Sequence, residues 1–179
     1  VGYSRDATTF ELRLKQGVAP QNDRFADRAI LSGVDLAVTG DNTLANREWY
    51  EPSYGPDVAA TVWWQWTAPS DGWAELRSEG SDFPVALAVF TLQPNAPERL
   101  DYLGSVPGLA KLGDEAHPTS AIGFNAHAGT VYFVRLDGYE RRAGGFRMHL
   151  GLSPAPANDS FTTAAVLEGV SYNVRADLR

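Results

Sequence analysis

The beginning of this chain repeats at its end, and this repeat constrains the fold more than any other feature. Residues 1–43 align with residues 137–179 at a constant offset of 136 positions and without a gap. Seventeen of the 43 aligned pairs are identical, among them Asn22-Asp23 with Asn158-Asp159. A fixed period of this kind indicates copies of one folding unit. The chain therefore holds about one and a third copies of a 136-residue unit.

Linker-like segments mark the boundaries of the unit. Two segments of the pattern Ala-Pro-x-Asn-Asp begin at positions 19 and 155, and proline before a polar residue suits a short, stiff linker. The complete unit is therefore expected to cover residues 18–153. Residues 1–17 read as the end of a preceding unit, and residues 154–179 read as the start of a following one. Such arrays are more typical of rods, linkers and adhesins than of enzymes.

Composition excludes several classes of protein. The hydrophobic fraction of 44% indicates a globular chain. The net charge of −7, with no basic stripe, argues against nucleic acid as a partner. No run of about 18 apolar residues is present, so the sequence contains no membrane span. The absence of cysteine excludes a disulfide scaffold and cysteine-based metal or nucleophile chemistry, and it suits a bacterial extracellular protein.

The pattern of residues predicts an all-β fold. The 17 glycines and 11 prolines divide the chain into short segments. Alternation with β-branched and aromatic residues predicts half-buried strands near residues 9–14, 60–66, 73–77, 85–90, 130–136 and 145–150. Short strands at this spacing are typical of a sandwich or jelly roll. One short helix fits residues 25–31, with Asp23 as its N-cap.

Two long stretches lack periodicity and are expected to be loops. They cover residues 41–57 and 93–119, and both are polar. Loops of this length inside a compact domain are usually functional or covered by a partner.

The predicted strand at 60–66 carries three of the five tryptophans. Alternation places Trp64 and Trp66 on one face, which we expect to be the core, and Trp63 on the other. Trp63 is then either covered by the 41–57 loop or exposed as a platform for a ligand, and its loss should cost less stability. Aromatic clusters can stack on sugar rings or anchor protein interfaces. Both alternatives fit the aromatic residues of that loop, Trp49, Tyr50 and Tyr54.

Catalytic motifs are missing from the sequence. His117, His127 and His149 lie on different segments and lack the spacing of a metal-binding pair. There is no G-x-S-x-G nucleophile elbow, and carboxylate pairs such as Glu48/Glu51 occur on any acidic surface. We therefore expect a protein that is not an enzyme.

The segments that carry a family resemblance follow one another through almost the whole unit. They are NDRFADRAILSG (22–33), TG-N with A-x-x-E-x-x-EP (39–52), TVWWQWTAPSDGWAEL (61–76), GSDFPVALAVFT (80–91) and FNAHAGTVYFVRLDG (124–138). In this order they resemble the bacterial pre-peptidase C-terminal domain family, which occurs, often in tandem, in large secreted bacterial proteins. The resemblance implies a non-catalytic β-sandwich of jelly-roll type, attached to proteases, adhesins and other exported proteins.

The resemblance also implies calcium in some members and collagen or polysaccharide in others. The family's Phe-Asp-Thr and Asn-Asp-Asp are replaced here by Phe83-Pro84-Val85 and by the apolar segment at 106–109, so those acidic positions are missing. Hard cations prefer several oxygen ligands. Candidates are Asn22 and Asp23 of the linker and, on the loop, Asp41, Glu48, Glu51 and Asp57. The alternative role for Asn22 and Asp23 is capping and turn hydrogen bonding.

The leading hypothesis for function is a structural or adhesive repeat of a large secreted or cell-surface bacterial protein. The main rival is a polysaccharide- or collagen-binding module accessory to a secreted enzyme, and a third reading is a domain of a protease precursor. Residues 1–17 and 154–179 cannot bury their apolar groups alone. Either neighbouring repeats complete them, or identical chains meet head to tail and form a fibre. The residues expected at this inter-repeat interface are Phe10, Leu12, Leu14, Phe161, Val166 and Leu167.

Overall fold

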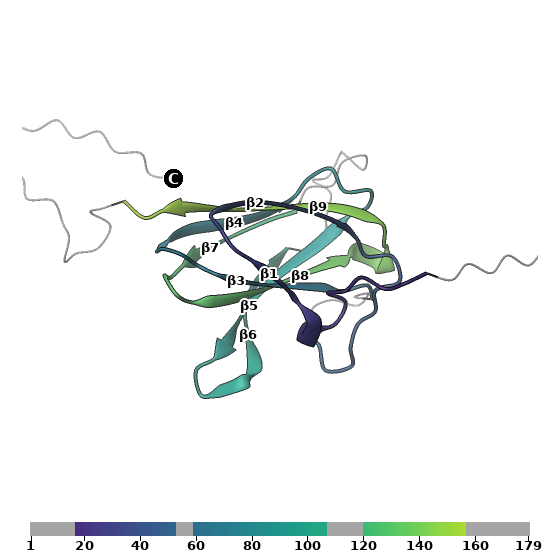
Figure 1. Ribbon diagram of the computed structural model, residues 1–179, viewed down its shortest axis with the longest axis horizontal. Coiled ribbons are helices and arrows are strands. Elements are labelled where there is room, and N and C mark those ends of the chain that lie inside the picture. The colour runs from purple at the N-terminus through teal and green to yellow at the C-terminus, as the bar shows by residue number, and fades with distance from the viewer. Residues whose placement is uncertain (1–16, 53–58, 107–119, 157–179) are drawn as a thin grey trace, which may run out of the picture.

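The computed structural model describes residues 17–52, 59–106 and 120–156 (Figure 1). These residues form the 3-10 helices η1 (Phe25–Asp27) and η2 (Tyr139–Arg141) and the strands β1 (Ala29–Leu31), β2 (Asp35–Asp41), β3 (Val62–Thr67), β4 (Gly72–Ser78), β5 (Val85–Gln93), β6 (Ala96–Val106), β7 (Ser120–Ala126), β8 (Val131–Gly138) and β9 (Gly145–Pro154). Within these ranges, no helix is long and apolar enough to cross a membrane. Outside them lie Tyr54, Asp57 and the expected inter-repeat residues Phe10, Leu12, Leu14, Phe161, Val166 and Leu167.

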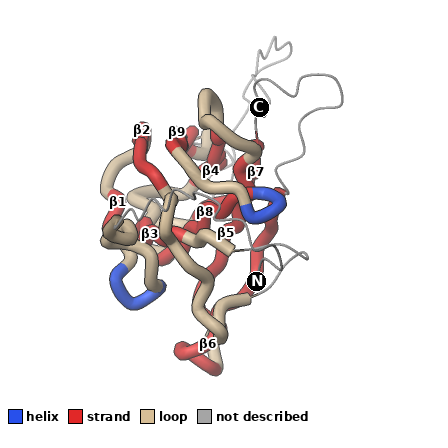
Figure 2. Tube along the Cα trace, turned by 90° about the vertical axis from the view of Figure 1, so that its right-hand side faces the viewer, coloured by secondary structure: helices blue, strands red, loops and turns tan. Residues whose placement is uncertain are grey.

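The strands form two sheets that pack face to face (Figures 1 and 2). One sheet has the order β1-β3-β8-β5-β6, and the other has the order β2-β9-β4-β7. The short β1 runs parallel to β3, whereas the other strand pairs are antiparallel. Consecutive described strands change sheets at every step except β5–β6, a pattern typical of jelly rolls. The predicted antiparallel β-sandwich is confirmed.

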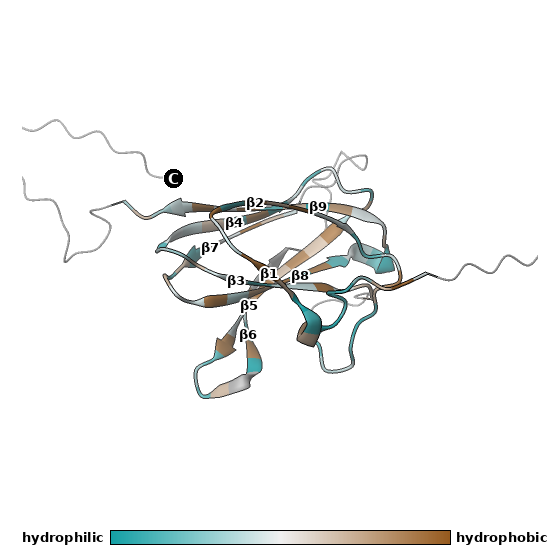
Figure 3. Ribbon diagram, viewed as in Figure 1, coloured by the Kyte–Doolittle hydropathy of each residue, from teal (hydrophilic) through white to brown (hydrophobic). Residues whose placement is uncertain are grey.

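The main core lies between the two sheets and is built from alternating residues. Trp64 and Trp66 on β3 are 4% and 0% exposed and belong to this core, so their predicted facing is confirmed. Figure 3 shows the hydrophobic residues gathered on the strands. Both sheets contribute, since the core includes Leu76 and Leu150 of the four-stranded sheet and Val134 of the five-stranded sheet.

The helix predicted over residues 25–31 is wrong in length and in its cap. The helical segment η1 covers three residues, and its N-cap is Arg24, with no side-chain capping bond. The carboxylate of Asp23 is engaged elsewhere, because it accepts two hydrogen bonds from Asn46. Residues 29–31 instead pair with β3 as a strand, since an open sheet edge offers backbone partners that a short isolated helix lacks.

The stretch 93–119 is not wholly a loop, because it contains the strand β6. This strand lies at the edge of the five-stranded sheet, below the sandwich in Figures 1 and 2. It pairs only with β5 among the described strands, and its register shifts at Val89/Phe90 and at Leu92/Gln93. An edge strand tolerates proline and irregular register because one side of its backbone needs no strand partner. Pairing therefore creates a strand where the sequence shows no alternation.

Candidate functional site

A second apolar layer covers the outer face of the five-stranded sheet. It consists of Trp63, Ala88, Phe90 and Phe133, all nearly fully buried, and we call it the outer layer. The central strands of this sheet carry apolar side chains on both faces, so each face has to pack against another part of the chain. The sandwich core covers one face, and a different part of the chain covers the other.

The linker and η1 form one part of this cover. The Trp63 N–H donates to Asn22 O at 2.9 Å, and Asn22 Nδ2 donates to Trp63 O at 3.0 Å. The ring of Phe25 packs edge-on against Trp63, with 5.1 Å between ring centroids, and it lies 5.2 Å from Phe133. The guanidinium of Arg28 lies over the Phe25 ring at 4.7 Å. These contacts fix the linker across the sheet.

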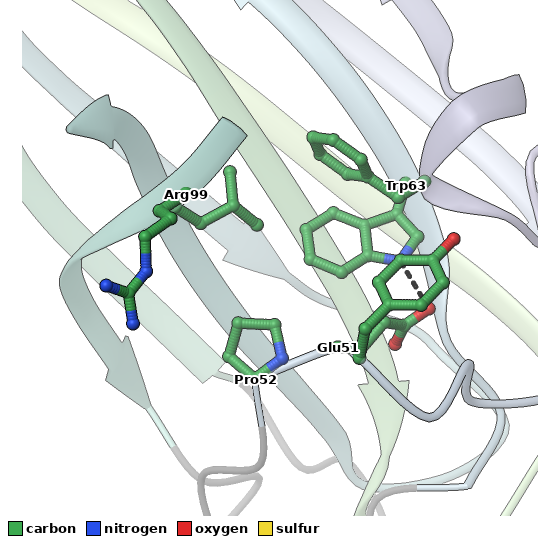
Figure 4. Close-up of a pocket in the computed structure, with 7 residues that line it drawn as sticks. Glu51, Pro52, Trp63 and Arg99 are labelled. Atoms are coloured by element: carbon green, nitrogen blue, oxygen red, sulfur yellow. Dashed lines mark hydrogen bonds between the residues drawn. The ribbon is translucent and has the colours of Figure 1, made fainter. Parts of the chain in front are cut away.

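Residues 42–52 form the other part of the cover, and Glu51 is their anchor (Figure 4). Its Oε1 accepts hydrogen bonds from Trp63 Nε1 at 3.0 Å and from Thr61 Oγ1 at 3.2 Å. Arg135 Nη1 donates to the Pro52 carbonyl, and its guanidinium lies 5.8 Å from the centre of the Trp63 ring. Trp63 is therefore covered and 0% exposed, which is the first of the two alternatives for this residue.

A pocket of about 320 Å³ opens beside this anchor. Figure 4 shows Glu51, Pro52, Trp63 and Arg99 around it, with the Glu51 carboxylate directed to the indole N–H. Its wall is mostly aromatic and aliphatic, and its carboxylate is already engaged by two donors. The full lining is Phe25, Tyr50, Glu51, Pro52, Trp63, Arg99 and Leu100.

Four of the candidate calcium ligands, the carboxylates of Asp23, Asp41, Glu48 and Glu51, accept hydrogen bonds from groups of the linker, the loop and β3 or its approach. Asp23 Oδ1 accepts from the Asn46 N–H at 2.6 Å, and Asp23 Oδ2 accepts from Asn46 Nδ2 at 2.9 Å. Glu48 Oε2 accepts from the Phe25 N–H at 3.0 Å, and Asp41 Oδ1 accepts from the Thr43 N–H at 2.7 Å. In the part of the chain that the structure describes, no three His, Cys, Asp or Glu side chains are grouped to hold a metal.

Two carboxyl groups are buried deeply enough to change their acidity. Burial raises the pKa of Glu51, although hydrogen bonds from Trp63 and Thr61 act in the opposite direction. Burial also raises the pKa of Asp137, whose Oδ1 accepts from the N–H groups of Ala60 and Gly138. Within the described ranges, Glu51 Oε2 and Asp137 Oδ2 have no hydrogen-bond partner. Such groups favour the protonated form in the folded state.

The domain should therefore lose stability as the pH rises from mildly acidic values toward neutrality. In the unfolded chain, Asp and Glu side chains release their protons at a pH of about 4. In the folded domain, Glu51 and Asp137 keep their protons to a higher pH. Between these pH values the folded state binds more protons, so the free energy of unfolding falls with rising pH. Denaturant titrations of the wild type and of Glu51→Gln across this window provide the measurement. In the variant, the free energy of unfolding should fall less steeply with rising pH. If it falls as steeply as in the wild type, Glu51 does not cause the pH dependence.

A hydrogen bond to Glu48 is the main cause that raises the pKa of Tyr50 to about 12. The ring of Tyr50 packs edge-on against Trp49, with 5.6 Å between centroids, and Trp49 itself is 90% exposed. The structure thus brings Tyr50, Glu51 and Trp63 together at the pocket, while Trp49 lies at the surface.

Sequence reasoning did not select Trp73, which is 44% exposed on β4. A signal was present, because period-two alternation places Trp73 on the same face as Glu75 and Arg77. A tryptophan grouped with charged residues is expected on an outer face of a sheet, where it is available for contacts.

No protein-family model matches this sequence, and no curated protein matches it either. Several solved structures share a likeness with this chain, among them the following three. The pre-peptidase C-terminal domain of a collagenase from Bacillus anthracis is 9% identical, with a TM-score of 0.41, covering 69% of this chain and 93% of that chain. A periplasmic inhibitor of g-type lysozyme from Aeromonas hydrophila is 11% identical, with a TM-score of 0.39 and coverage of 70% and 96%. A family 35 carbohydrate-binding module from an environmental isolate is 12% identical, with a TM-score of 0.32 and coverage of 56% and 74%. These values are too low to assign a family or a ligand.

Proposed function

We propose that this chain carries a non-catalytic structural or adhesive repeat domain of a large secreted or cell-surface bacterial protein, of the pre-peptidase C-terminal type. The observation that carries the proposal is the path of the chain through the sandwich. Figure 1 shows the described part of the chain entering the sandwich at one end of the long axis and leaving it, after β9, at the opposite end. Units with this path can follow one another in line. The 136-residue repeat in the sequence indicates that such units occur in succession.

The fixation of both linkers supports this role. The first linker is held by the reciprocal bonds between Asn22 and Trp63. The last described residues are held by the Ala155 N–H, which donates to Asp71 O at 3.1 Å. Short linkers that are bonded to a sandwich limit the angles between successive units. The Asn-Asp pair recurs in the sequence at 158–159, so the asparagine of the first anchor has a counterpart at the second linker.

The chemistry of the outer layer also favours a structural role. The carboxylates of the segments that cover it accept hydrogen bonds from backbone, indole and hydroxyl donors. These contacts fasten the loop to the linker and to the sheet. Neighbouring units, in the same chain or in an identical chain, are the partners that the proposal implies. The proposal places the domain outside the cell or on its surface.

The proposal is tested on polypeptides with one, two and three copies of the unit. Small-angle X-ray scattering should show a maximum dimension that grows by an equal step with each copy, as expected for units in line. Asn22→Ala in the second unit should widen the distribution of inter-unit distances between spin labels, because it removes one bond of the anchor. A two-copy chain as compact as two units folded back on each other would refute an extended array.

A further inference from the structure

The outer face of the four-stranded sheet presents an aromatic side chain among charged ones. On β4, Ala74 and Leu76 point into the core, so Trp73, Glu75 and Arg77 point outward. Trp73 is 44% exposed, although a side chain of its size usually gains by burial. Single exposed hydrophobic residues are common on protein surfaces. The surroundings of Trp73 therefore decide whether it belongs to a binding site.

A glycine holds the indole of Trp73 against the sheet. Gly123 on β7 is in register with Glu75, next to Trp73. A Cβ atom on Gly123 would lie 2.2 Å from Cζ2 and 2.7 Å from Cε2 of Trp73, so no other residue type leaves room for the ring. The backbone therefore supports the six-membered ring of the indole, and the exposed part of the ring is available to a ligand. A ring fixed in this way loses little conformational entropy on binding.

Small residues keep the sheet surface low beside the ring. Glu75 lies between Gly123 on one neighbouring strand and Gly151 on the other. The result is a shallow hollow of about 360 Å³, with Trp73 as its large exposed apolar side chain. The full lining is Asp35, Trp73, Glu75, Arg77, His149, Gly151, Leu152 and Ser153.

The polar side chains of this hollow are arranged in two contacting pairs. Arg77 Nε contacts Glu75 Oε1, and His149 Nε2 lies 2.5 Å from Asp35 Oδ1. Two carboxylates, of Asp35 and Glu75, lie beside the single guanidinium of Arg77, so the hollow has no excess of positive charge that would attract an anionic ligand. The guanidinium has several N–H donors and each carboxylate has several acceptor positions, so the pairs retain hydrogen-bonding capacity. Hydroxyl groups, which both donate and accept, match such a mixed set.

We propose that this face binds an uncharged polysaccharide, with one sugar ring stacked on Trp73. A pyranose has an apolar face of C–H groups that suits the indole, and hydroxyl groups at its edge that suit Glu75, Arg77 and His149. A protein partner fits less well, because interface centres are rich in apolar and aromatic groups and poor in charge. The site goes beyond the proposed structural role and does not depend on it, since a single unit contains all of these residues.

The test is affinity electrophoresis of the full chain in gels that contain one polysaccharide each. Neutral probes are β-1,3-glucan, hydroxyethyl cellulose, galactomannan and dextran, and acidic probes are alginate and polygalacturonate. At least one neutral probe should retard the wild type. Trp73→Ala should weaken that binding by about tenfold or more, as for aromatic residues at the centre of other binding sites. Trp73→Phe should retain part of it.

Two further variants make the test specific to this face. Gly123→Ala keeps Trp73 but displaces its ring, and it should weaken binding while melting curves show a folded domain. Trp49→Ala, at the other exposed tryptophan of the described residues, should leave binding unchanged. The proposal is overturned if no neutral probe retards the chain, if only acidic probes or immobilised collagen bind, or if Trp49→Ala abolishes binding and Trp73→Ala does not.

Discussion

Trp66→Ala is expected to lower the free energy of unfolding by about 3–5 kcal/mol. Trp66 is 0% exposed in the main core, and its ring lies 5.7 Å from that of Tyr132. Its Nε1 donates to the Gly33 carbonyl at 2.9 Å. Gly33 has a φ of 129° and lies in the turn where the chain leaves β1 and crosses to β2 in the other sheet. The substitution thus opens a cavity and also frees the turn that joins the two sheets.

Since domains are stable by only about 5–15 kcal/mol, this loss is a large share of the total. Denaturant titration at constant temperature gives the value directly, with an m-value similar to the wild type if unfolding stays two-state. Trp66→Phe separates the two contributions, because it keeps an aromatic ring and removes the bond to Gly33. A loss below about 1 kcal/mol for Trp66→Ala would mean that the core closes around the cavity, contrary to the packing seen here.

Trp63→Ala is expected to destabilise the domain by a similar amount, about 3–5 kcal/mol. Alternation along the strand had suggested a smaller loss, because Trp63 points away from the sandwich core. The structure changes this expectation, since Trp63 is 0% exposed and packs against Phe25 and Phe90 in the outer layer. Its loss also removes a hydrogen-bond donor from the buried Glu51 carboxylate. The Glu51 carboxyl group then keeps only the Thr61 hydroxyl as a side-chain donor. A buried polar group that loses a partner is costly, so residues 42–52 should loosen as well.

A matched series tests this explanation. Trp63→Phe keeps an aromatic ring and removes the indole N–H, and it should cost about 1–3 kcal/mol through the lost hydrogen bond to the buried Glu51 carboxyl group. Trp49→Ala, at a residue that is 90% exposed, should change stability by less than about 0.5 kcal/mol. If Trp63→Ala behaves like Trp49→Ala, the outer layer does not contribute to stability, and the role given to residues 42–52 is wrong.

Alternation in the sequence predicts the central strands better than the edge strands. Strands β3, β4, β5, β8 and β9 lie close to where alternation predicted them. The strand β2 was not predicted, although its paired residues 35–41 run without a register shift along β9. The strand β6 was predicted as loop. Edge strands need to satisfy only one neighbour, so their sequences show weaker alternation than central strands.

The candidate site was predicted only in part. Sequence reasoning selected Tyr50, Glu51 and Trp63, and the structure places all three around one pocket. It named Glu51 as one candidate ligand for calcium, and the structure shows its carboxylate accepting hydrogen bonds from Trp63 and Thr61. The partner of a buried carboxylate is set by which distant segment folds over it. The residues next to Glu51 in the sequence therefore do not predict its hydrogen-bond partners.

The sequence by itself determined the repeat, the all-β class and the side of β3 that faces the main core. These properties follow from periodicity, because a strand that alternates with period two has one consistent inner face. Only the tertiary structure decided that Trp63 is buried as deeply as Trp66, and that Trp73 rests on Gly123 at the surface. Burial of an outward-facing side chain depends on long-range cover. For Trp63 that cover comes from the linker and residues 42–52, whereas Gly123 supports Trp73 from the neighbouring strand and leaves it exposed.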